Sequence, residues 1–220
     1  MFRVYCILIG YVFGLFQTAF FYGKLHGIDI REHGSGNAGT TNTIRVLGTK
    51  AGLIVFAGDV LKCMLAILVT WLIFGRTGVG SVYLVKIYTA AGTILGHNFP
   101  FYMKFKGGKG IASTAGFILS FNPWFIPVGM VMFFGAFLIT HYVSLGALLI
   151  YVGFMVQLIL MGQFGCFGMT QPELTELYLV GLFLAVMAFL RHRQNIVRLA
   201  KGCEKKTYLF INKKGENPNI

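Results

Sequence analysis

The chain has 220 residues and a net charge of +12, with hydrophobic residues at 56% of positions and charged residues at only 12%. Soluble domains carry about 25% charged residues, so this composition excludes an ordinary soluble protein and predicts an all-α, polytopic membrane protein. A nucleic-acid-binding surface is also excluded, because interleaved spans leave no folded basic face large enough to track a duplex, and loops beside a membrane are commonly rich in Lys and Arg.

The first apolar segment, from about Val4 to Tyr22, predicts a retained membrane span. Its apolar run continues without the small-residue cleavage site of a signal peptide. Gly10 and Gly14 form a G-x-x-x-G pair within it, a pattern that permits close helix packing but is common by chance. A polar stretch follows at 23–50.

This polar stretch contains the sequence R-E-H-G-S-G-N-A-G-T-T-N-T-I-R at 31–45. Glycine lets the backbone approach a ligand closely because it has no Cβ. Small hydroxyls and flanking arginines then suit oxyanions, above all phosphate. The stretch also fits G-x-G-x-x-G at Gly34–Gly39, but a dinucleotide-binding fold needs a strand before this motif, and here a membrane span precedes it. We therefore expect a phosphate-binding loop and exclude the dinucleotide fold.

The second span is expected from about Ala51 to Phe74 and carries Asp59 and Lys62, three residues apart on one helical face. Pairing lowers the cost of burying either charge. Charged groups inside a membrane are candidates for a functional role, but self-pairing near one end of the span explains this couple equally well. The residues alone leave both interpretations open.

A third span is expected from about Val82 to Leu95, and a second unusual loop, G-H-N-F-P-F-Y-M-K-F-K-G-G-K-G, follows at 96–110. Its lysines flank glycines just before an apolar helix begins, and the amides and dipole of a helix start make an anion site. Anchoring to anionic lipid is the alternative, although anchoring requires neither the glycines nor His97-Asn98. The P-loop pattern G-x-x-x-x-G-K-[ST] is not matched, so an NTPase is not expected.

Apolar sequence resumes at Ile111, but Asn122-Pro123 interrupts it after about ten residues, too few to cross a hydrocarbon core of about 30 Å as a helix. A short, tilted or re-entrant segment is therefore expected. Further spans are expected at about Trp124–Ile139, Ser144–Leu160 and Leu174–Leu190. The chain then has about seven membrane segments in a single domain, 1–220, with a basic and flexible tail at 206–220.

The distribution of charge predicts the orientation. Segments 24–50, 104–109 and 191–214 together hold 15 of the 19 Lys and Arg residues, and alternating spans place all three on one face. The positive-inside rule then puts the N-terminus outside and these three segments in the cytoplasm. Their location on one face indicates a shared site more strongly than any one motif does.

Single reactive or metal-binding residues are weaker indications of function than the three loops. The cysteines at positions 6, 63, 166 and 203 have no zinc-like spacing, so no metal site is expected. His192 and Asn195 share one face where the last span leaves the membrane; a histidine there can act as a base and an asparagine can orient a hydroxyl, but both can also simply face water. G-x-S-x-G is absent, and no His is followed five residues later by Asp, so two common acyl-transfer signatures fail.

Three segments together resemble the cytoplasmic motifs of the bacterial acyl-phosphate:glycerol-3-phosphate acyltransferases. They are the 31–45 loop, G-H-N-F-P-F-Y-M-K-F-K-G-G-K-G-I-A from Gly96, and R-H-R-Q-N-I-V-R-L-A-K-G-C-E-K-K from Arg191. The similarity spans the chain and includes D-V-L-K in the second span and Y-V-S-L-G at 142–146. It implies acyl transfer from acyl phosphate to glycerol 3-phosphate, giving lysophosphatidic acid in the bacterial inner membrane, with seven spans, an external N-terminus and no cofactor. We expect a monomer within the lipid bilayer.

The resemblance also assigns residues. The expected catalytic residues are Ser35, Arg45, His192 and Asn195. The expected substrate-binding residues are Gly36, Asn37, Gly39, Thr41 and Asn42 in the first loop, Lys104, Gly107, Gly108, Lys109 and Gly110 in the second, and Ser144 and Glu204 beyond them. In this assignment Ser35 and Thr41 grip the acyl phosphate, whereas Arg45, Lys104, Ser144 and His192 hold glycerol phosphate and Asn195 orients the attacking hydroxyl. Position 141 is His, whereas the family often has Arg there, so the resemblance does not determine the charge at this position.

An acyl phosphate is already activated, so direct attack needs no covalent acyl-enzyme, and the substrate's own phosphate can serve as the base. The acyl chain is expected in a groove between spans that is open to lipid. The competing class is a transporter or channel for a phosphorylated metabolite, with Asp59 and Lys62 as an ion relay. Polar residues gather at one face rather than at the midplane of the spans, which favours the enzyme. A purely structural membrane protein leaves the glycine-rich loops unexplained.

Overall fold

The structure is a computed structural model that describes residues 1–78 and 80–208, and every regular element in that part of the chain is a helix. In chain order these are α1 (Phe2–Gly14), α2 (Thr18–Leu25), the 3₁₀ turn η1 (Ile30–Glu32), α3 (Thr40–Leu47), α4 (Thr49–Phe74), α5 (Val82–Asn98), the 3₁₀ turn η2 (Phe101–Met103), α6 (Ile111–Phe121), α7 (Phe125–Thr140), α8 (Val143–Gln163), α9 (Gln171–Arg191) and α10 (Arg193–Ala200). The predicted all-α class is confirmed. The predicted flexible tail lies outside the described residues from 209 onward.

The predicted membrane spans coincide with helices. Four stretches of the described chain are long and apolar enough to cross a membrane: Phe2–Leu25, Thr49–Phe74, Val143–Gln163 and Gln171–Arg191. The apolar helices α6 and α7 are shorter. With 11 residues, α6 extends about 16 Å, so the short segment predicted after the second loop is confirmed. The number of crossings, about seven, and the orientation stay predictions.

Helices α1 and α5 pack backbone against backbone through glycines. A Cβ on Gly10 would lie 2.2 Å from the carbonyl oxygen of Thr89, and one on Gly14 would lie 2.2 Å from that of Thr93. Helix α5 also has a glycine at this contact, because a Cβ on Gly96 would lie 2.3 Å from a carbonyl oxygen of α1. Small residues at such seams let membrane helices approach closely. The G-x-x-x-G pair of the first span therefore has a packing role.

The first span, predicted from about Val4 to Tyr22, is confirmed as the apolar stretch Phe2–Leu25, but its helix is interrupted. Helix α1 ends at Gly14 and α2 begins at Thr18. The carbonyls of residues 14, 15 and 16 at the break accept hydrogen bonds from the side chains of Gln17 (3.3 Å), Tyr102 (2.6 Å) and Lys62 (2.7 Å), respectively. An interruption at membrane depth is tolerated only where such partners satisfy the backbone.

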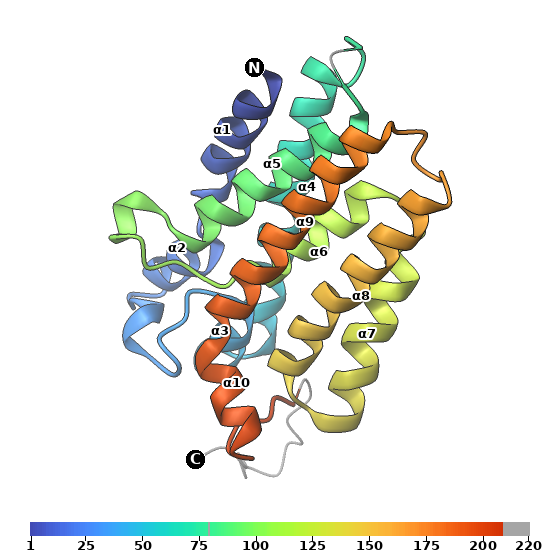
Figure 1. The fold of residues 1–220 in the computed structure, drawn as a ribbon. Coiled ribbons are helices and arrows are strands. Elements are labelled where there is room, and N and C mark those ends of the chain that lie inside the picture. The colour runs from blue at the N-terminus through green and yellow to red at the C-terminus, as the bar shows by residue number, and fades with distance from the viewer. Residues whose placement is uncertain (79, 209–220) are drawn as a thin grey trace.

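The polar loops gather at one end of the bundle. Figure 1 shows α2, α3 and α10 together at the end away from the N-terminus. Helices α7 and α8 form a hairpin at one side, and α9 runs beside α5 and α8 before it leads into α10. The apolar spans thus carry the three unusual loops to a common region, as their charge predicted.

Candidate active site

The first polar loop is shaped by its own side chains. Asp29 accepts hydrogen bonds from the Nη2 (2.7 Å) and Nε (3.0 Å) atoms of Arg31, and this pairing lowers the pKa of Asp29 to about 2. The buried Asn42 donates to two loop carbonyls at 3.0 Å each and accepts from the Ser35 amide at 2.7 Å. Asn42 therefore holds the loop in shape, and both ends of its amide are engaged by the backbone.

The glycines of the second loop are required by packing. A Cβ on Gly107 would lie 2.1 Å from the His97 carbonyl oxygen, and one on Gly108 would lie 2.1 Å from Nε2 of the same histidine. The amides of Gly107 and Gly108 donate to the carbonyls of Asn98 (3.2 Å) and His97 (3.1 Å). These two amides are engaged within the protein and do not point at a ligand, contrary to expectation. Gly110 begins α6 with a φ of +82°, a conformation that favours glycine.

All three loops meet at Gly107-Gly108. A Cβ on Gly108 would lie 2.7 Å from the carbonyl oxygen of Ala38 in the first loop. From the third segment, the Nη2 atom of Arg191 donates to the carbonyls of Gly107 (3.1 Å) and Gly108 (2.8 Å). The Arg191 guanidinium also lies 5.2 Å from the centre of the Phe99 ring. The predicted co-location of the loops is thus a direct contact, between backbones for the first two loops and through the Arg191 side chain for the third segment.

A hydrogen-bonded chain of polar side chains lies beside this junction. Lys109 donates to Oδ1 of Asn195 at 2.5 Å, and Nδ2 of Asn195 donates to Glu204 at 2.6 Å. The same carboxylate accepts from Ser144 at 2.8 Å and from Arg198 at 2.6 Å. The second loop, the start of α8 and the third segment are joined by these bonds. Four residues predicted for the site are therefore in one network.

Arg45 reaches this network from the first loop. Its Nη2 atom donates to the hydroxyl of Thr207 at 3.3 Å and to the carbonyl of Lys205 at 3.4 Å. The amide of Thr207 in turn donates to the carbonyl of His141 at 2.9 Å, and the His141 ring lies 4.8 Å from that of Tyr208. The segment after α10 is thereby held across the site.

Burial and neighbouring charge set the protonation of the site. Burial, together with the positive charges of Arg198, Arg191 and Arg45, lowers the pKa of Lys109 to about 8, against the opposing effect of Glu204. Three arginines thus act on Lys109, and the Glu204 carboxylate opposes them. Such an excess of positive charge suits ligands that carry several negative charges.

The carboxylate at the centre of the network remains ionised. Burial alone would raise the pKa of Glu204, but hydrogen bonds from Asn195, Arg198 and Ser144 outweigh burial and lower it. Arg45 is half-buried, and burial lowers its pKa while Glu204 opposes the change. Arginine remains charged at neutral pH even so. The ion pair between Glu204 and Arg198 lies within the third segment, and the bonds from Ser144 to Glu204 and from Lys109 to Asn195 join this segment to α8 and the second loop.

His192 is buried and neutral. Burial, together with the charge of Lys109, lowers its pKa to about 4. Its Nδ1 atom lies 2.8 Å from the carbonyl oxygen of Ala188, which assigns the proton to Nδ1 and leaves Nε2 as an acceptor. A histidine with so low a pKa is a weak general base. It can still accept a hydrogen bond from a substrate hydroxyl.

Lys104 does not belong to the network around Glu204. The expected grouping of Lys104 with Arg45 and His192 does not match the structure, in which Lys104 and Gly36 line a separate cavity of about 390 Å³ together with Asp29, Arg31, Glu32, Tyr102, Met103 and Lys106. Lys104 and Phe105 both have left-handed backbone, with φ of 54° and 59°. Lys109, and not one of the two earlier lysines, lies beside Asn195.

The predicted first-loop residues differ in exposure. Ser35 and Gly36 are exposed, Asn37 and Thr41 are half-buried, and Gly39 is buried at the start of α3. The hydroxyl of Thr40 is buried without a hydrogen-bond partner, as are the side chain of Asn98 and the hydroxyl of Ser113. Buried polar atoms without partners are uncommon. They mark a polar interior beside the starts of α3 and α6, where a phosphate can find donors.

Three contributors to the site were not singled out by the sequence pattern. Arg191 and Arg198 lie in the third motif but carried no signal beyond their charge, and Thr207 lies in a segment predicted to be flexible. Only the fold shows that Arg191 holds the glycine turn and that Arg198 pairs with Glu204. Within residues 1–78 and 80–208, no three His, Cys, Asp or Glu side chains are grouped closely enough to hold a metal ion.

Comparisons with known proteins identify the family of this chain. The family model described as glycerol-3-phosphate acyltransferase matches residues 4–202. The chain is 36% identical over 207 residues to a glycerol-3-phosphate acyltransferase of Thermoanaerobacter sp. (strain X514), covering 94% of this chain and 96% of that protein. It is 40% identical to that of Thermosipho melanesiensis, covering 93% and 92%. A crystal structure of an integral membrane glycerol 3-phosphate acyltransferase, in its glycerol 3-phosphate form, superposes with a TM-score of 0.79 at 29% identity, covering 94% and 96%. The chain therefore belongs to the glycerol-3-phosphate acyltransferase family.

Proposed function

We propose that this protein transfers an acyl group from acyl phosphate to glycerol 3-phosphate, giving lysophosphatidic acid and inorganic phosphate. The observation that carries the proposal is the convergence of all three polar loops at Gly107-Gly108 beside a network rich in cations. Solved relatives described as glycerol 3-phosphate and lysophosphatidic acid forms support the acceptor and the product. The resemblance of the three loops supports acyl phosphate as the donor.

The site has to bring two phosphates together. At an effective dielectric constant near 20, each pair of unit negative charges at about 4 Å repels by roughly 4 kcal/mol. Arg45, Lys109 and Arg198 offset this repulsion from three directions, since all three influence one another electrostatically. We place the glycerol phosphate group among Arg45, Lys109 and Ser144, with Lys109 in the role that the resemblance gave to Lys104.

The acyl phosphate group is placed at the first loop. Ser35 and Thr41 offer hydroxyls there, and the partnerless hydroxyl of Thr40 adds a third at the start of α3. The dipole of that helix start favours a dianionic group. In this arrangement Asn195 positions Lys109 through their 2.5 Å hydrogen bond and so sets the distance between the two phosphates.

The reaction proceeds by direct attack. The hydroxyl oxygen of glycerol phosphate forms a bond to the acyl carbon, the bond from that carbon to the phosphate oxygen breaks, and the hydroxyl proton passes to a phosphate oxygen. His192 accepts a hydrogen bond from the hydroxyl at Nε2 and orients it, since a pKa of about 4 makes it too weakly basic to take the proton. Positioning and charge stabilisation then supply the catalysis.

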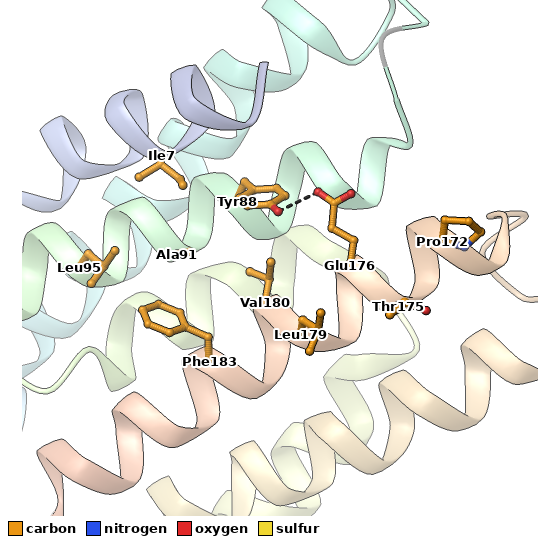
Figure 2. Close-up of a pocket in the computed structure, with 10 residues that line it drawn as sticks. All are labelled: Ile7, Tyr88, Ala91, Leu95, Pro172, Thr175, Glu176, Leu179, Val180 and Phe183. Atoms are coloured by element: carbon orange, nitrogen blue, oxygen red, sulfur yellow. Dashed lines mark hydrogen bonds between the residues drawn. The ribbon is translucent and has the colours of Figure 1, made fainter. Parts of the chain in front are cut away.

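We place the acyl chain in an apolar groove, whose lining side chains Figure 2 shows. This cavity of about 520 Å³ is lined by α1, α5 and α9, from Leu95 and Phe183 to Glu176. Leu95 is two residues from His97, so the groove begins near the loop junction. Its far end carries the hydrogen bond of 2.7 Å from Tyr88 to Glu176. Leu179 and Phe183 are exposed along the groove, which leaves it open to lipid.

Filling the groove should shorten the accepted chain. Ala91, which is 3% exposed, lines the groove between α1 and α9. An Ala91→Phe ring that excludes two chain carbons removes about 1.6 kcal/mol of apolar burial. The expected result is a fall of about tenfold in kcat/KM for a 16-carbon donor, with an 8-carbon donor used as before. The control is Leu182→Phe on the exposed face of α9, which should not change the preference between donors. Equal losses of kcat/KM for both donors in Ala91→Phe would contradict the placement of the acyl chain in this groove.

The active site is proposed to face the cytoplasm. The loops that form it hold most of the Lys and Arg residues, and basic loops remain on the cytoplasmic side. The relatives are bacterial proteins, which supports the bacterial inner membrane as the location. Cysteine scanning with a membrane-impermeant thiol reagent tests this orientation in protein whose exposed Cys166 and Cys203 are replaced by Ser. In that background Lys201→Cys should react only after the membrane is opened, and Thr77→Cys in the turn after α4 should react in intact cells.

The transporter alternative receives less support. An ion relay needs Asp59 and Lys62 to exchange partners, but both are buried and bound to each other at 2.7 Å, and Lys62 also donates to the Phe16 carbonyl. The direct test of the enzyme is to incubate purified protein with acyl phosphate and labelled glycerol 3-phosphate. Labelled lysophosphatidic acid is expected, with acyl-CoA as the comparison donor. Vesicle uptake of intact glycerol 3-phosphate without product would favour the transporter instead.

A further inference from the structure

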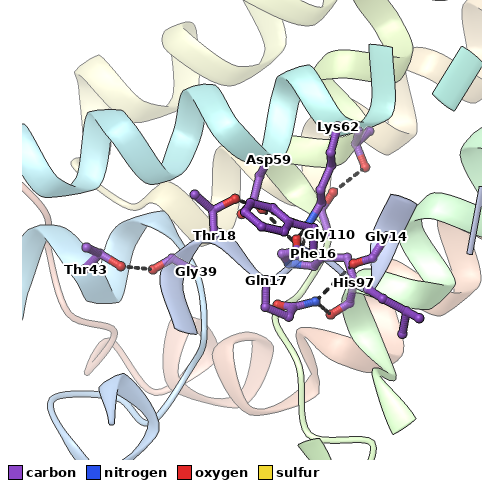
Figure 3. A network of polar contacts seen from close by, with 12 residues as sticks. Gly14, Phe16, Gln17, Thr18, Gly39, Thr43, Asp59, Lys62, His97 and Gly110 are labelled. Carbon is purple, nitrogen blue, oxygen red and sulfur yellow. Dashed lines mark hydrogen bonds and ion pairs between the residues drawn. The ribbon is translucent and has the colours of Figure 1, made fainter. Parts of the chain in front are cut away.

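The buried charges of the second span form part of a network that the reaction does not explain (Figure 3). Asp59, Lys62 and His97 are each at most 5% exposed. They join three elements: α4, the end of α5, and the break in the first span. His97 is also the residue on which Gly107-Gly108 pack. The network therefore lies directly beneath the point where the three loops meet.

All three protons of the Lys62 ammonium group are used. Its Nζ atom lies 2.7 Å from Oδ1 of Asp59, 2.7 Å from the carbonyl oxygen of Phe16 and 2.8 Å from Nδ1 of His97. An ammonium group has three donors and no acceptor, so Nδ1 of His97 accepts. The imidazole proton then lies on Nε2, the atom that faces Gly108.

His97 is held at its backbone as well as its ring. Its carbonyl oxygen accepts from the Gly108 amide at 3.1 Å and from Nε2 of Gln17 at 2.8 Å. Gln17 is fully buried at the break in the first span. The carboxylate of Asp59 accepts from Thr18 at 2.9 Å as well as from Lys62. The break thus supplies three groups to the network: the Phe16 carbonyl and the side chains of Gln17 and Thr18. These hydrogen bonds account for the interruption of the helix, which packing alone does not explain.

We infer that Asp59 and Lys62 are positioning residues for acyl transfer. Lys62 fixes the His97 ring as the Nε2–H tautomer and Asp59 neutralises and orients Lys62. The fixed ring sets the place of the Gly107-Gly108 turn, and that turn sets Lys109 beside Asn195. This inference rests on the proposed function, because it concerns the geometry of the same site. Small displacements of positioned groups are costly, about 100-fold in rate for about 1 Å.

A merely structural ion pair makes a different prediction. Removing one partner of a buried pair leaves an uncompensated charge and destabilises the protein strongly, whereas replacing both with neutral groups of similar size is often tolerated. The double variant Asp59→Asn/Lys62→Met is therefore expected to insert and to unfold close to the wild-type temperature. Its kcat should nevertheless fall by about 10- to 100-fold, while KM for glycerol 3-phosphate changes less.

The control is the other lysine within a span. Lys86 donates to the carbonyl of Phe121 at 2.8 Å, away from the loop junction, and Lys86→Met should transfer acyl groups like the wild type. Wild-type kcat in the Asp59→Asn/Lys62→Met protein would overturn the inference while leaving the proposed function intact. Absence of transfer by the wild-type protein itself would instead refute the proposed function.

A spectroscopic measurement tests the tautomer without any destabilised variant. Nitrogen NMR of wild-type protein labelled at histidine, with the His97 signal assigned from a His97→Gln sample, should show Nε2 protonated and Nδ1 unprotonated. The double variant should lose this pattern. A wild-type His97 that is protonated at Nδ1, or at both nitrogens, would contradict the role assigned to Lys62.

Discussion

Arg45→Ala should reduce kcat/KM for glycerol 3-phosphate by about 10²–10³-fold, because it removes a charged donor that the transition state needs more than the bound substrate does. Arg45 is half-buried and reaches the network around Glu204 from the first loop. The loss corresponds to about 3–4 kcal/mol. Initial-rate measurements on purified protein with acyl phosphate and glycerol 3-phosphate check this value.

Two further variants make the Arg45 result specific. Arg45→Lys keeps the charge but loses the planar fork that can hold two phosphate oxygens, so it should recover only part of the rate. Arg76→Ala is the matched control, since Arg76 packs on Trp71 in the turn after α4 and should leave the rate unchanged. Near wild-type transfer by Arg45→Ala, in protein that inserts normally, would contradict the assignment of glycerol phosphate to this residue.

Lys109→Met should cause the second large loss, also about 10²-fold or more in kcat/KM. Lys109 lies within the network through Asn195, whereas Lys104 and Lys106 line a different cavity. Lys106→Met is the control and should transfer like the wild type. Lys104→Met should lose far less activity than Lys109→Met; the reverse order would restore the role that the resemblance gave to Lys104.

The pH dependence of the rate provides an independent check on Lys109. Its pKa is lowered to about 8, so the ammonium form, which binds phosphate, is present below pH 8 and is lost as the pH rises through that value. The expected kcat/KM therefore declines above about pH 8. Lys109→Arg should remove this decline because a guanidinium does not titrate there. A decline that persists in Lys109→Arg would assign it to another group.

The spans were predictable because hydrophobicity alone determines them. Helices α4, α8 and α9 begin and end within three residues of the expected positions. The break at Leu15–Gln17 was not predictable in this way, because no Pro or Gly occupies those three positions. The residues that stabilise the break are Lys62 and Tyr102. They are far away in the sequence, so only the fold brings them to the free carbonyls.

The membership of the site was predictable only in part. Charge topology and the resemblance placed Arg45, Ser144, Asn195 and Glu204 on one face. The structure joins Ser144, Asn195 and Glu204 by hydrogen bonds and brings Arg45 within electrostatic range of Glu204. Neither charge topology nor the resemblance could distinguish among the lysines of K-F-K-G-G-K-G. That choice depends on the left-handed backbone at Lys104 and on how the glycine turn packs against His97. Both features are properties of the tertiary structure rather than of the local sequence.

The glycines of the second loop show the same limit of prediction from the local sequence. A run of Gly beside Lys indicates a loop that cradles phosphate with its amides, but the amides of Gly107 and Gly108 bind carbonyls at the end of α5. The requirement for glycine arises because there is no room for a Cβ against His97. The loop therefore contributes to phosphate binding by placing Lys109 and by joining the first and third loops.

The central claim is that two phosphorylated substrates meet in one composite site and that the acyl group passes directly between them. It is tested most directly in a single turnover, with purified protein in excess over donor labelled in the acyl group. Without glycerol 3-phosphate, we predict neither released phosphate nor labelled protein. Its addition should then give lysophosphatidic acid and phosphate in equal amounts and at the same rate. A burst of phosphate with labelled protein before the acceptor is added would contradict direct transfer.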